Sequence, residues 1–330
     1  MRPYTAGFLI FPGFPMACLT SMIEPLRAAN EISGKQAFQW ELISESPGKI
    51  SASALVEFEP TRTLDTLGPL DLMILLSAPT AQFQAAKTPG LLRTLNRHGT
   101  VLGAVSGGVF PLMRAGLPSP KPVAVHWCYK SAFDAEFPDQ TGSDQVIEIS
   151  AKLLTAAGAA AAFDLSLHLI EQRLGAGVAT EVACWFQHPI MRREGVLQAV
   201  PSLSTSTTGQ QFPLLVQTAV TILSQKLEDP ISIQELASQL AITPRHLERS
   251  FKQSTGLNPT HYYRKLRMDA ARQMVHYTNE PLSDVSSAVG YSSLQTFGKH
   301  YLSAFGVTPK EDRKRINLFR VRGNLPVPSV

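Results

Sequence analysis

The last third of the chain carries an amphipathic pattern with a tight turn in its middle. Within residues 231–251 the apolar side chains form two faces at helical spacing: Leu236, Ala237 and Leu240, then Leu247 and Phe251. Thr243 suits a helix N-cap, because its hydroxyl can accept a hydrogen bond from a free backbone N–H. Pro244 suits the first helical position, where no N–H is needed. The pattern predicts two short helices joined by a turn.

The same pattern recurs about 50 residues later. It predicts a helix over residues 282–289, a turn over 290–293 and a second helix over 294–302. Gly290 in the turn can adopt a left-handed backbone conformation without steric cost. Residues 259–278 carry apolar side chains at helical spacing, and we expect a spacer helix there. Two such pairs about 50 residues apart suit two helices that enter neighbouring turns of one duplex, roughly 34 Å apart.

The second helix of the first pair exposes only polar side chains on the face opposite Leu247 and Phe251. These side chains are Arg245, His246, Glu248 and Arg249. A short helix with a buried apolar side and an exposed basic face fits the major groove of DNA. The sequence therefore predicts a tandem helix-turn-helix unit.

Residues from about 213 to 315 resemble the DNA-binding domain of AraC/XylS-family transcription regulators. The motifs that carry the resemblance are Leu236–Ala237, Arg245–Phe251, Gly256–Pro259, Ala288–Ser293 and Phe305–Pro309. In that family the second helix of each unit enters the major groove. The resemblance therefore implies DNA contacts by Arg245, His246, Glu248 and Arg249 in the first unit and by Ser292, Leu294, Gln295, Thr296 and Lys299 in the second. Leu294 is apolar, and we expect it to contact a thymine methyl or nothing.

Short apolar runs alternate with helical patterns over the first 195 residues. Strands are predicted over residues 4–11, 38–44, 70–76, 101–105, 123–127 and 146–149, and helices over 17–30, 90–98, 109–115 and 158–175. Residues 181–193 are predicted to form a helix and a turn. This alternation is typical of a parallel α/β sheet covered on both faces. Ligands bind such sheets at the carboxyl ends of the strands. Four corners are expected there: Pro12–Gly13, Ser77–Ala78, Ser106–Gly107 and His126–Trp127.

Ser106 follows a predicted strand in the run Ala104–Gly108, which is similar to the nucleophile elbow of hydrolases. An amide hydrolase would need a base near Ser106 and an acid behind that base. His126, His168 and His188 are candidate bases and Asp164 is a candidate acid. The alternative is a corner of small residues whose backbone N–H groups hold an anion at a helix start. The sequence leaves both interpretations open.

Residues 5 to about 190 resemble the PfpI-like branch of the class I glutamine amidotransferase superfamily, a flavodoxin-like α/β sandwich. The resemblance is carried by Phe8–Gly13, Glu24–Asn30, Val105–Phe110, Ala115–Leu117, His126–Trp127, Ala157–Gly158 and Asp164–His168. In catalytic relatives the elbow carries a cysteine and the first helix region an acidic partner. Here Ser106 and Cys18 occupy these positions. The resemblance thus implies a ligand-binding domain that is not an enzyme.

A sandwich followed by a tandem helix-turn-helix unit resembles the GlxA-type subgroup of AraC-family regulators. Glu24–Asn30 and His188–Pro189 look most like regulators of glycine betaine, carnitine and arginine catabolism. The implied effector is a small amine or amino-acid-like metabolite. Trp127 could offer its ring to an ammonium group, or it could be a core aromatic, and His126 could be structural. The effector-binding candidates are Cys18, Ser106, Gly107, His126 and Trp127.

Charge supports the assignment of DNA binding to the second part of the chain. The 330 residues have a net charge of +4, but residues 211–330 hold 15 Lys and Arg against 9 Asp and Glu, a net +6. Phosphate binding needs such an excess. The scattered Cys18, Cys128 and Cys184 indicate reduced thiols in a cytoplasm, and they predict neither a disulfide frame nor a metal site. No apolar run reaches the roughly 18 residues of a membrane span. No cofactor is expected.

The run of Ser and Thr in residues 200–211 separates the two parts. We expect an α/β ligand-sensing and dimerisation domain over residues 1–195, a flexible linker over 196–211, the all-α DNA-binding domain over 212–316 and a disordered tail over 317–330. The expected function is a cytoplasmic, homodimeric transcription regulator, an activator that contacts promoter DNA, a small effector and RNA polymerase. The alternatives are an amide hydrolase that uses Ser106 and an α/β dimerisation module without a ligand.

Overall fold

A computed structural model describes residues 2–117, 119, 121–188, 191–198, 212–277 and 280–317. These residues divide into two compact units, residues 2–198 and 212–317. Residues 199–211 of the expected linker and residues 318–330 of the expected tail lie outside the described residues. Val196 to Gln198, where we expected the linker to begin, are hydrogen bonded within the first unit.

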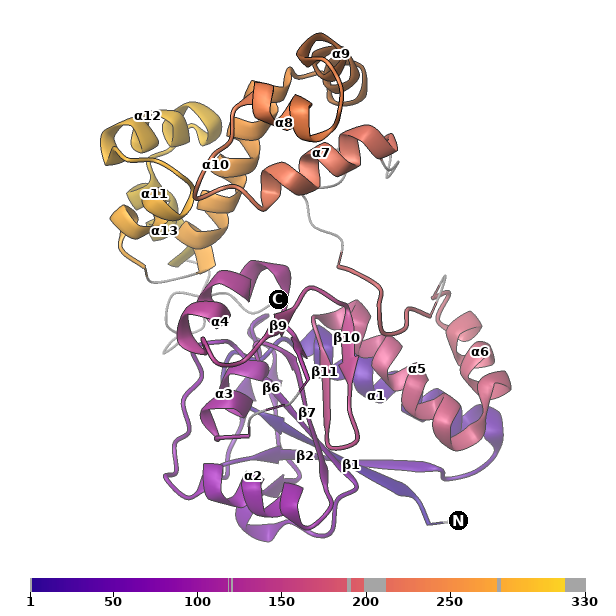
Figure 1. Cartoon of the computed structure of the whole chain (residues 1–330). Coiled ribbons are helices and arrows are strands. Elements are labelled where there is room, and N and C mark those ends of the chain that lie inside the picture. The colour runs from indigo at the N-terminus through magenta and orange to yellow at the C-terminus, as the bar shows by residue number, and fades with distance from the viewer. Residues whose placement is uncertain are drawn as a thin grey trace. The chain divides into compact units, whose positions relative to one another are not determined.

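A seven-stranded sheet forms the centre of the first unit (Figure 1). In spatial order its strands are β10 (Ile147–Ile149), β11 (Leu153–Ala156), β7 (Val101–Ser106), β6 (Leu72–Ser77), β1 (Tyr4–Ile10), β2 (Phe38–Ser44) and β5 (Arg62–Thr63). Every neighbouring pair is parallel except β10 and β11. The carboxyl ends of six strands therefore meet at one edge, where Ser77 pairs in register with Ser106.

Helices cover both faces of this sheet. On one face α1 (Met16–Ser33), α5 (Ala159–Leu174) and α6 (Ala176–Trp185) pack together, while α2 (Thr88–Arg97) and α3 (Val109–Arg114) lie against β6 and β7 on the other (Figure 1). Side chains of a strand point alternately to the two faces. Ala6, Phe8 and Ile10 accordingly share one hydrophobic cluster with the side chains of α1 and α5. The expected flavodoxin-like sandwich is confirmed.

Two expectations about single elements of this unit need correction. The strand predicted over residues 123–127 is only β8 (Val123–Ala124), which pairs with β9 (Gly142–Ser143) outside the main sheet. The strand next to β7 in the sheet is instead β11, which was not predicted because its four residues give too short an apolar signal. The helix and turn predicted over 181–193 are present, but the helix starts earlier, at Ala176, and ends at Trp185.

The remaining short elements of the first unit lie around the sheet. They are β3 (Ile50–Ser51), β4 (Glu57–Phe58), η1 (Leu64–Thr66), η2 (Trp127–Tyr129) and α4 (Lys130–Glu136). η2 begins at His126, whose imidazole accepts a hydrogen bond from the N–H of Cys128. This local cap turns the chain out of the extended conformation that its apolar sequence predicts, which explains why β8 is so short.

The second unit consists of helices that surround one long helix. The helices are α7 (Leu214–Ser224), α8 (Ile233–Gln239), α9 (Pro244–Thr255), α10 (Pro259–Tyr277), α11 (Leu282–Ala288), α12 (Leu294–Phe305) and α13 (Pro309–Asn317). The first half of α10 packs Tyr262, Tyr263 and Leu266 into a cluster with α7, α8 and α9. Its second half packs into another cluster with α11 and α12. The predicted spacer helix is confirmed as α10, the element shared by both halves.

The second helices of the two helix-turn-helix pairs match at an offset of 50 residues. Thr243 and Ser293 are the N-caps of α9 and α12, and each accepts a hydrogen bond from the N–H three residues on. The left-handed C-cap glycines, Gly256 and Gly306, are also 50 residues apart. The turn residues Ala241 and Gly290 both have positive φ, at 53° and 73°. The predicted pairs are thus confirmed, with a non-glycine residue in the first turn.

A buried carboxylate joins the helices of the second half. Asp312 on α13 is only 3% exposed and accepts hydrogen bonds from Arg272 Nε at 2.8 Å and the Tyr301 hydroxyl at 2.9 Å. His276 Nε2 lies 3.0 Å from the same carboxylate. Burial acts to raise the pKa of Asp312, but the hydrogen bonds from Arg272, Tyr301 and His276 outweigh it and hold that pKa below its usual range.

Gly290→Ala should destabilise the second unit, because a Cβ at this position would lie 2.5 Å from the Leu227 carbonyl oxygen and the backbone would keep a φ of +73°. We expect a loss of about 2–4 kcal/mol in the free energy of unfolding, measured with urea. Gly306→Ala is the control. Its φ is +70° but nothing lies within 4 Å of the added Cβ, so it should lose only about 1–2 kcal/mol. Equal losses would contradict the role assigned to the Leu227 carbonyl.

Asp312→Asn should lower the free energy of unfolding of the second unit at pH 7 by about 1–3 kcal/mol. Because the pKa of Asp312 is lowered on folding, its contribution is present above the unfolded pKa of about 4 and is lost as pH falls through the folded value. The difference between the two proteins should therefore shrink below about pH 4. Urea unfolding at pH 7 and at pH 3 measures it, and a difference that does not change with pH would be contrary evidence.

Candidate functional sites

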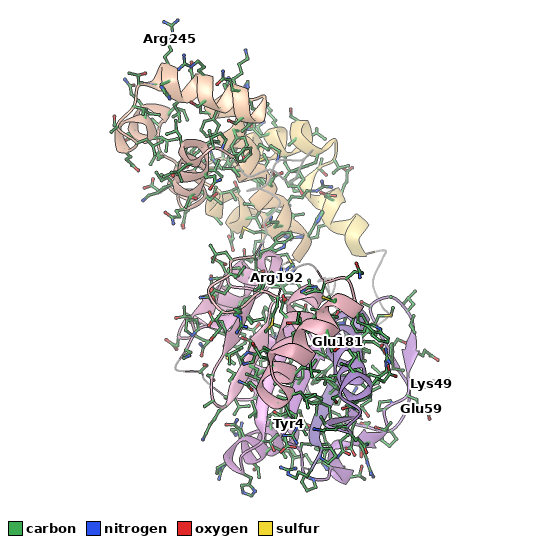
Figure 2. The ribbon with its side chains drawn as sticks, turned by 90° about the vertical axis from the view of Figure 1, so that its right-hand side faces the viewer. Tyr4, Lys49, Glu59, Glu181, Arg192 and Arg245 are labelled. Carbon is green, nitrogen blue, oxygen red and sulfur yellow. The ribbon has the colours of Figure 1, made fainter. Side chains whose placement is uncertain are left out.

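Helix α9 presents a polar face that its own core contacts define. Leu247 and Phe251 are fully buried in the cluster shared with α7, α8 and α10. The side chains on the opposite face are exposed: Arg245, His246, Glu248, Arg249 and Lys252. They border an open depression of about 900 Å³ together with Thr243 and Asn258, and Figure 2 shows Arg245 projecting into solvent. No described carboxylate forms an ion pair with Arg245 or Arg249, which leaves both guanidinium groups available for phosphate or base edges.

Helix α12 repeats this arrangement with different chemistry. Phe297 and Tyr301 are fully buried, and the predicted DNA-contacting residues are exposed: Ser292, Leu294, Gln295, Thr296 and Lys299. The 50-residue offset places Gln295, Thr296 and Lys299 where α9 has Arg245, His246 and Arg249. Leu294 is 51% exposed. A long cationic side chain therefore stands at the same place on both helices, in Arg249 and Lys299.

In the first unit, the chain turns sharply at the carboxyl end of β7. Ser106 is 1% exposed and has a φ of +57°, a strained conformation that is typical of a nucleophile elbow. A Cβ on Gly107 would lie 2.4 Å from the Ser77 carbonyl oxygen, so only glycine fits there. The N–H groups of Gly108 and Phe110 donate to the carbonyls of Val105 and Gly107. These two amides are therefore not free to hold an anion. An anion bound at this corner would need other N–H groups as donors.

His126 lies beside the same edge, although the residues around it do not form a strand of the main sheet. A Cβ on Gly158, just after β11, would meet its ring at 3.2 Å. His126 Nδ1 accepts from the Cys128 N–H at 3.3 Å and lies 2.9 Å from Cys128 Sγ. Burial lowers the pKa of His126 to about 4. The imidazole is therefore neutral at physiological pH, and its Nδ1 is engaged by Cys128.

The two remaining effector-binding candidates are Cys18, which is buried, and Trp127, which is partly exposed. Cys18 on α1 is fully buried, and burial raises the pKa of its thiol to about 12, so the reactive thiolate is absent at neutral pH. Trp127 is half-buried, and its ring centroid lies 5.3 Å from that of His126. The sequence predicted the Ser77–Ala78 corner at this edge, but it did not single out Ser77 as an effector-binding residue. Its buried hydroxyl has no hydrogen-bond partner among the described residues, and neither has that of Thr80.

Asp164, the candidate catalytic acid, forms a different cluster. It is fully buried on α5 and accepts from His188 Nε2 at 2.8 Å and Arg192 Nε at 2.8 Å. Among the described residues no carboxylate hydrogen bonds to His126, and His168 bonds to Gln172 on its own helix. The predicted pair of a histidine and Asp164 is thus present, but Arg192 shares the carboxylate. Such an arrangement is typical of an ion-paired structural cluster.

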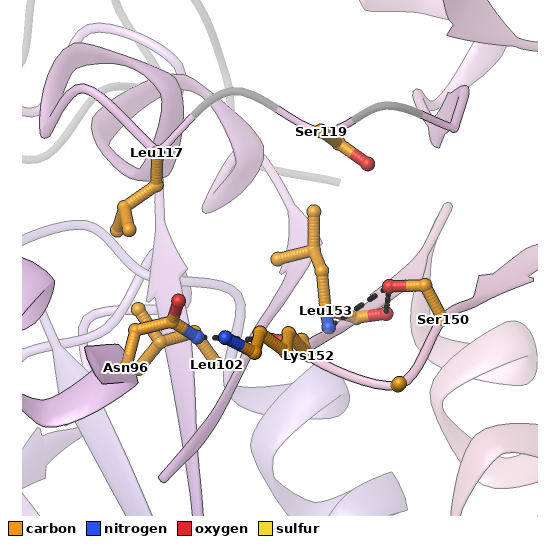
Figure 3. A pocket seen from close by; sticks show the side chains of 8 residues that line it. Asn96, Leu102, Leu117, Ser119, Ser150, Lys152 and Leu153 are labelled. Atoms are coloured by element: carbon orange, nitrogen blue, oxygen red, sulfur yellow. Dashed lines mark hydrogen bonds between the residues drawn. The ribbon is translucent and has the colours of Figure 1, made fainter. Parts of the chain in front are cut away.

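A separate pocket of about 260 Å³ lies at the opposite, amino-terminal edge of the sheet (Figure 3). Leu102, Leu117 and Leu153 form its apolar part. Its polar groups mostly bind neighbouring backbone: Asn96 Nδ2 donates to the Lys152 carbonyl at 3.2 Å, and the Ser150 hydroxyl donates to that of Leu153 at 3.0 Å. None of the predicted effector-binding residues lines this pocket.

No described helix is long and apolar enough to cross a bilayer. Within the same residues, no group of three His, Cys, Asp or Glu side chains is arranged to hold a metal ion.

Comparison with known proteins assigns the chain to a family. A model of a helix-turn-helix domain matches residues 236–315. The HTH-type transcriptional regulator GbdR of Pseudomonas aeruginosa is 31% identical over 328 residues, which cover 99% of this chain and 89% of GbdR. The HTH-type transcriptional regulator ArgR of the same organism is 31% identical over 319 residues, covering 95% of this chain and 94% of ArgR.

A solved structure shows a likeness of fold. The crystal structure of an AraC family transcriptional regulator from Pseudomonas putida superposes with a TM-score of 0.51 at 24% identity, covering 56% of this chain and 100% of that one. The relatives that match nearly the whole length, and the helix-turn-helix match over the two helix pairs of the second unit, show that the chain belongs to the AraC family of helix-turn-helix transcription regulators.

Proposed function

We propose that the protein activates transcription when a small amine or amino-acid-like metabolite binds its first unit. The observation that carries the proposal is the pair of matched helices α9 and α12, each anchored by two buried side chains four residues apart. In this proposal Arg245, His246, Glu248 and Arg249 contact one major groove, and Ser292, Leu294, Gln295, Thr296 and Lys299 contact the next. Neutral Gln295 and Thr296 replace Arg245 and His246, so the first helix provides more of the phosphate attraction.

The effector site is proposed at the carboxyl edge of the sheet. The strand order reverses between β1 and β6, and ligands of open α/β sheets bind at such a switch point. Ser77 ends β6 there, and its buried, unpartnered hydroxyl is the kind of group that a ligand or a water satisfies. Ser106, Gly107 and Cys18 line the proposed site, and His126 positions Trp127, whose half-buried ring would face an ammonium group.

The regulatory cycle follows from these two sites. A bound effector changes the population of conformations in which two second units can hold one promoter, and so changes operator affinity and contact with RNA polymerase. We propose a cytoplasmic homodimer, with the first unit providing the dimer contact. The buried, protonated thiol of Cys18 supports reversible binding over covalent chemistry at this edge.

Arg249→Ala tests the DNA interface. We expect binding to the specific operator to weaken by about 1–3 kcal/mol, measured by gel shift or anisotropy at fixed salt. If Arg249 contacts a base edge, binding to random DNA should change little. Arg97→Ala, which removes an exposed charge from α2 in the first unit, is the matched control and should bind both DNAs as the wild type does. Failure of the wild type to bind promoter DNA at low salt would refute the proposed function.

Trp127→Ala tests the effector site. A panel of amines and amino acids that includes glycine betaine, carnitine and arginine is screened by thermal shift on the full chain, because a ligand that binds only the folded state raises its melting temperature. The variant should lose most of the shift and keep its affinity for DNA. Trp185→Ala is the control, since Trp185 is 60% exposed on α6, and it should respond as the wild type does. A full response in Trp127→Ala would rule out this site.

A further inference from the structure

Gln198, the last described residue of the first unit, binds the backbone around Trp127. Its side-chain Oε1 accepts a hydrogen bond from the N–H of Trp127 at 2.9 Å. Its Nε2 donates to the carbonyl of Val125 at 2.8 Å and to that of Gln145 at 3.2 Å. The side-chain amide of Gln198 thus binds the backbone of both residues next to His126, Val125 and Trp127. The ring of His126 lies against Gly158 at the carboxyl edge of the sheet. A side chain that only accepts or only donates could not make this set of contacts.

The backbone before Gln198 is held along the same stretch. The N–H of Val146 donates to the Val196 carbonyl at 2.8 Å, and the N–H of Gln198 donates to the Asp144 carbonyl at 2.9 Å. Gln145 and Leu197 form an antiparallel bridge. Residues 195–198 therefore run as a short added strand beside residues 144–146. We call the described residues 191–198 the exit segment, since the chain continues from it toward the second unit.

The start of the exit segment is fixed to the same part of the sheet by another contact. His188 and Arg192 both bind the buried carboxylate of Asp164. Asp164 lies on α5, the helix that begins directly after Gly158. The exit segment is thus attached at Asp164 near its beginning and at Val125–Trp127 at its end. Leu197 and Val196 themselves are 69% and 40% exposed, so burial of apolar side chains does little to hold the end of the segment, and its hydrogen bonds carry the attachment.

We propose that Gln198 is the positioning residue that couples effector occupancy to the chain leading to the DNA-binding unit. This inference rests on the proposed function and on the placement of the effector beside Trp127. An effector that contacts the Trp127 ring moves the Trp127 N–H and the Val125 carbonyl. Gln198 spans both groups, so a shift of the loop makes or breaks its three hydrogen bonds together. The end of the exit segment, from which the chain continues toward the second unit, is then held or released.

Gln198→Met tests the coupling, because it keeps the length of the side chain and removes all three hydrogen bonds. Hydrogen exchange of the full chain, read on peptides that cover residues 124–129 and 143–147, is measured without effector. We expect exchange at the Trp127 amide to rise about tenfold or more, with the Asp164 cluster unchanged. Gln172→Met is the matched control, since Gln172 bonds only to His168 on its own helix. Unchanged exchange in Gln198→Met would overturn the proposal.

A second measurement separates coupling from stability. Operator affinity is compared with and without whichever of glycine betaine, carnitine and arginine stabilises the wild type. Gln198→Met and Gln198→Ala should both bring the ratio of the two affinities close to 1, from an expected ratio of about 5 or more in the wild type. A structural role alone would lower the melting temperature and leave the ratio unchanged, and that result also overturns the proposal.

The outcomes distinguish the coupling from the function on which it rests. A wild type that binds no promoter DNA refutes the proposed function. A wild type that responds to an effector alongside a Gln198→Met variant with the same response refutes only the coupling. If neither these three probes nor the rest of the amine and amino-acid panel stabilises the wild type, the proposed effector site is refuted, and the coupling that rests on it is refuted as well.

Discussion

The DNA-binding assignment depends on how two side chains four residues apart anchor each second helix. Leu247 with Phe251, and Phe297 with Tyr301, are all fully buried. Because residues four apart lie on one face of a helix, their burial turns the positions between them outward. The N-caps Thr243 and Ser293 then fix where each helix begins. A polar face that projects from the protein is therefore a consequence of apolar packing on the other side.

In the first unit the corresponding constraint is the direction of the strands. Parallel pairing brings the carboxyl ends of β1, β6, β7 and β11 to one edge, and close packing at Gly107 leaves no space there for a larger residue. The strained Ser106 persists because this packing holds it. The same geometry can serve a hydrolase or a binding protein.

Much of this architecture was predictable, because it rests on local signals. Caps, left-handed glycines and apolar spacing are properties of a few consecutive residues, and they predicted α9, α10 and α12. The end of the first unit at residue 198 was harder to predict from the sequence, because Gln198 is held by backbone groups more than 50 residues away in sequence. The same is true of Asp164, a plausible catalytic acid by sequence, which is instead bound by His188 and Arg192. Polar contacts between distant residues leave no periodic trace.

The long helix α10 has a consequence for the operator. Its two halves are built into different hydrophobic clusters, with Leu266 in one and Met268 in the other. An α-helix advances about 1.5 Å and rotates about 100° with every residue. Inserting or deleting one residue near Leu266 would therefore rotate α12 relative to α9 by about 100° around the axis of α10. The length of α10 would change by only about 1.5 Å. The angle between the exposed faces of α9 and α12 is thus set by the helical repeat of a single helix, and side chains on these two faces can be exchanged without changing that angle.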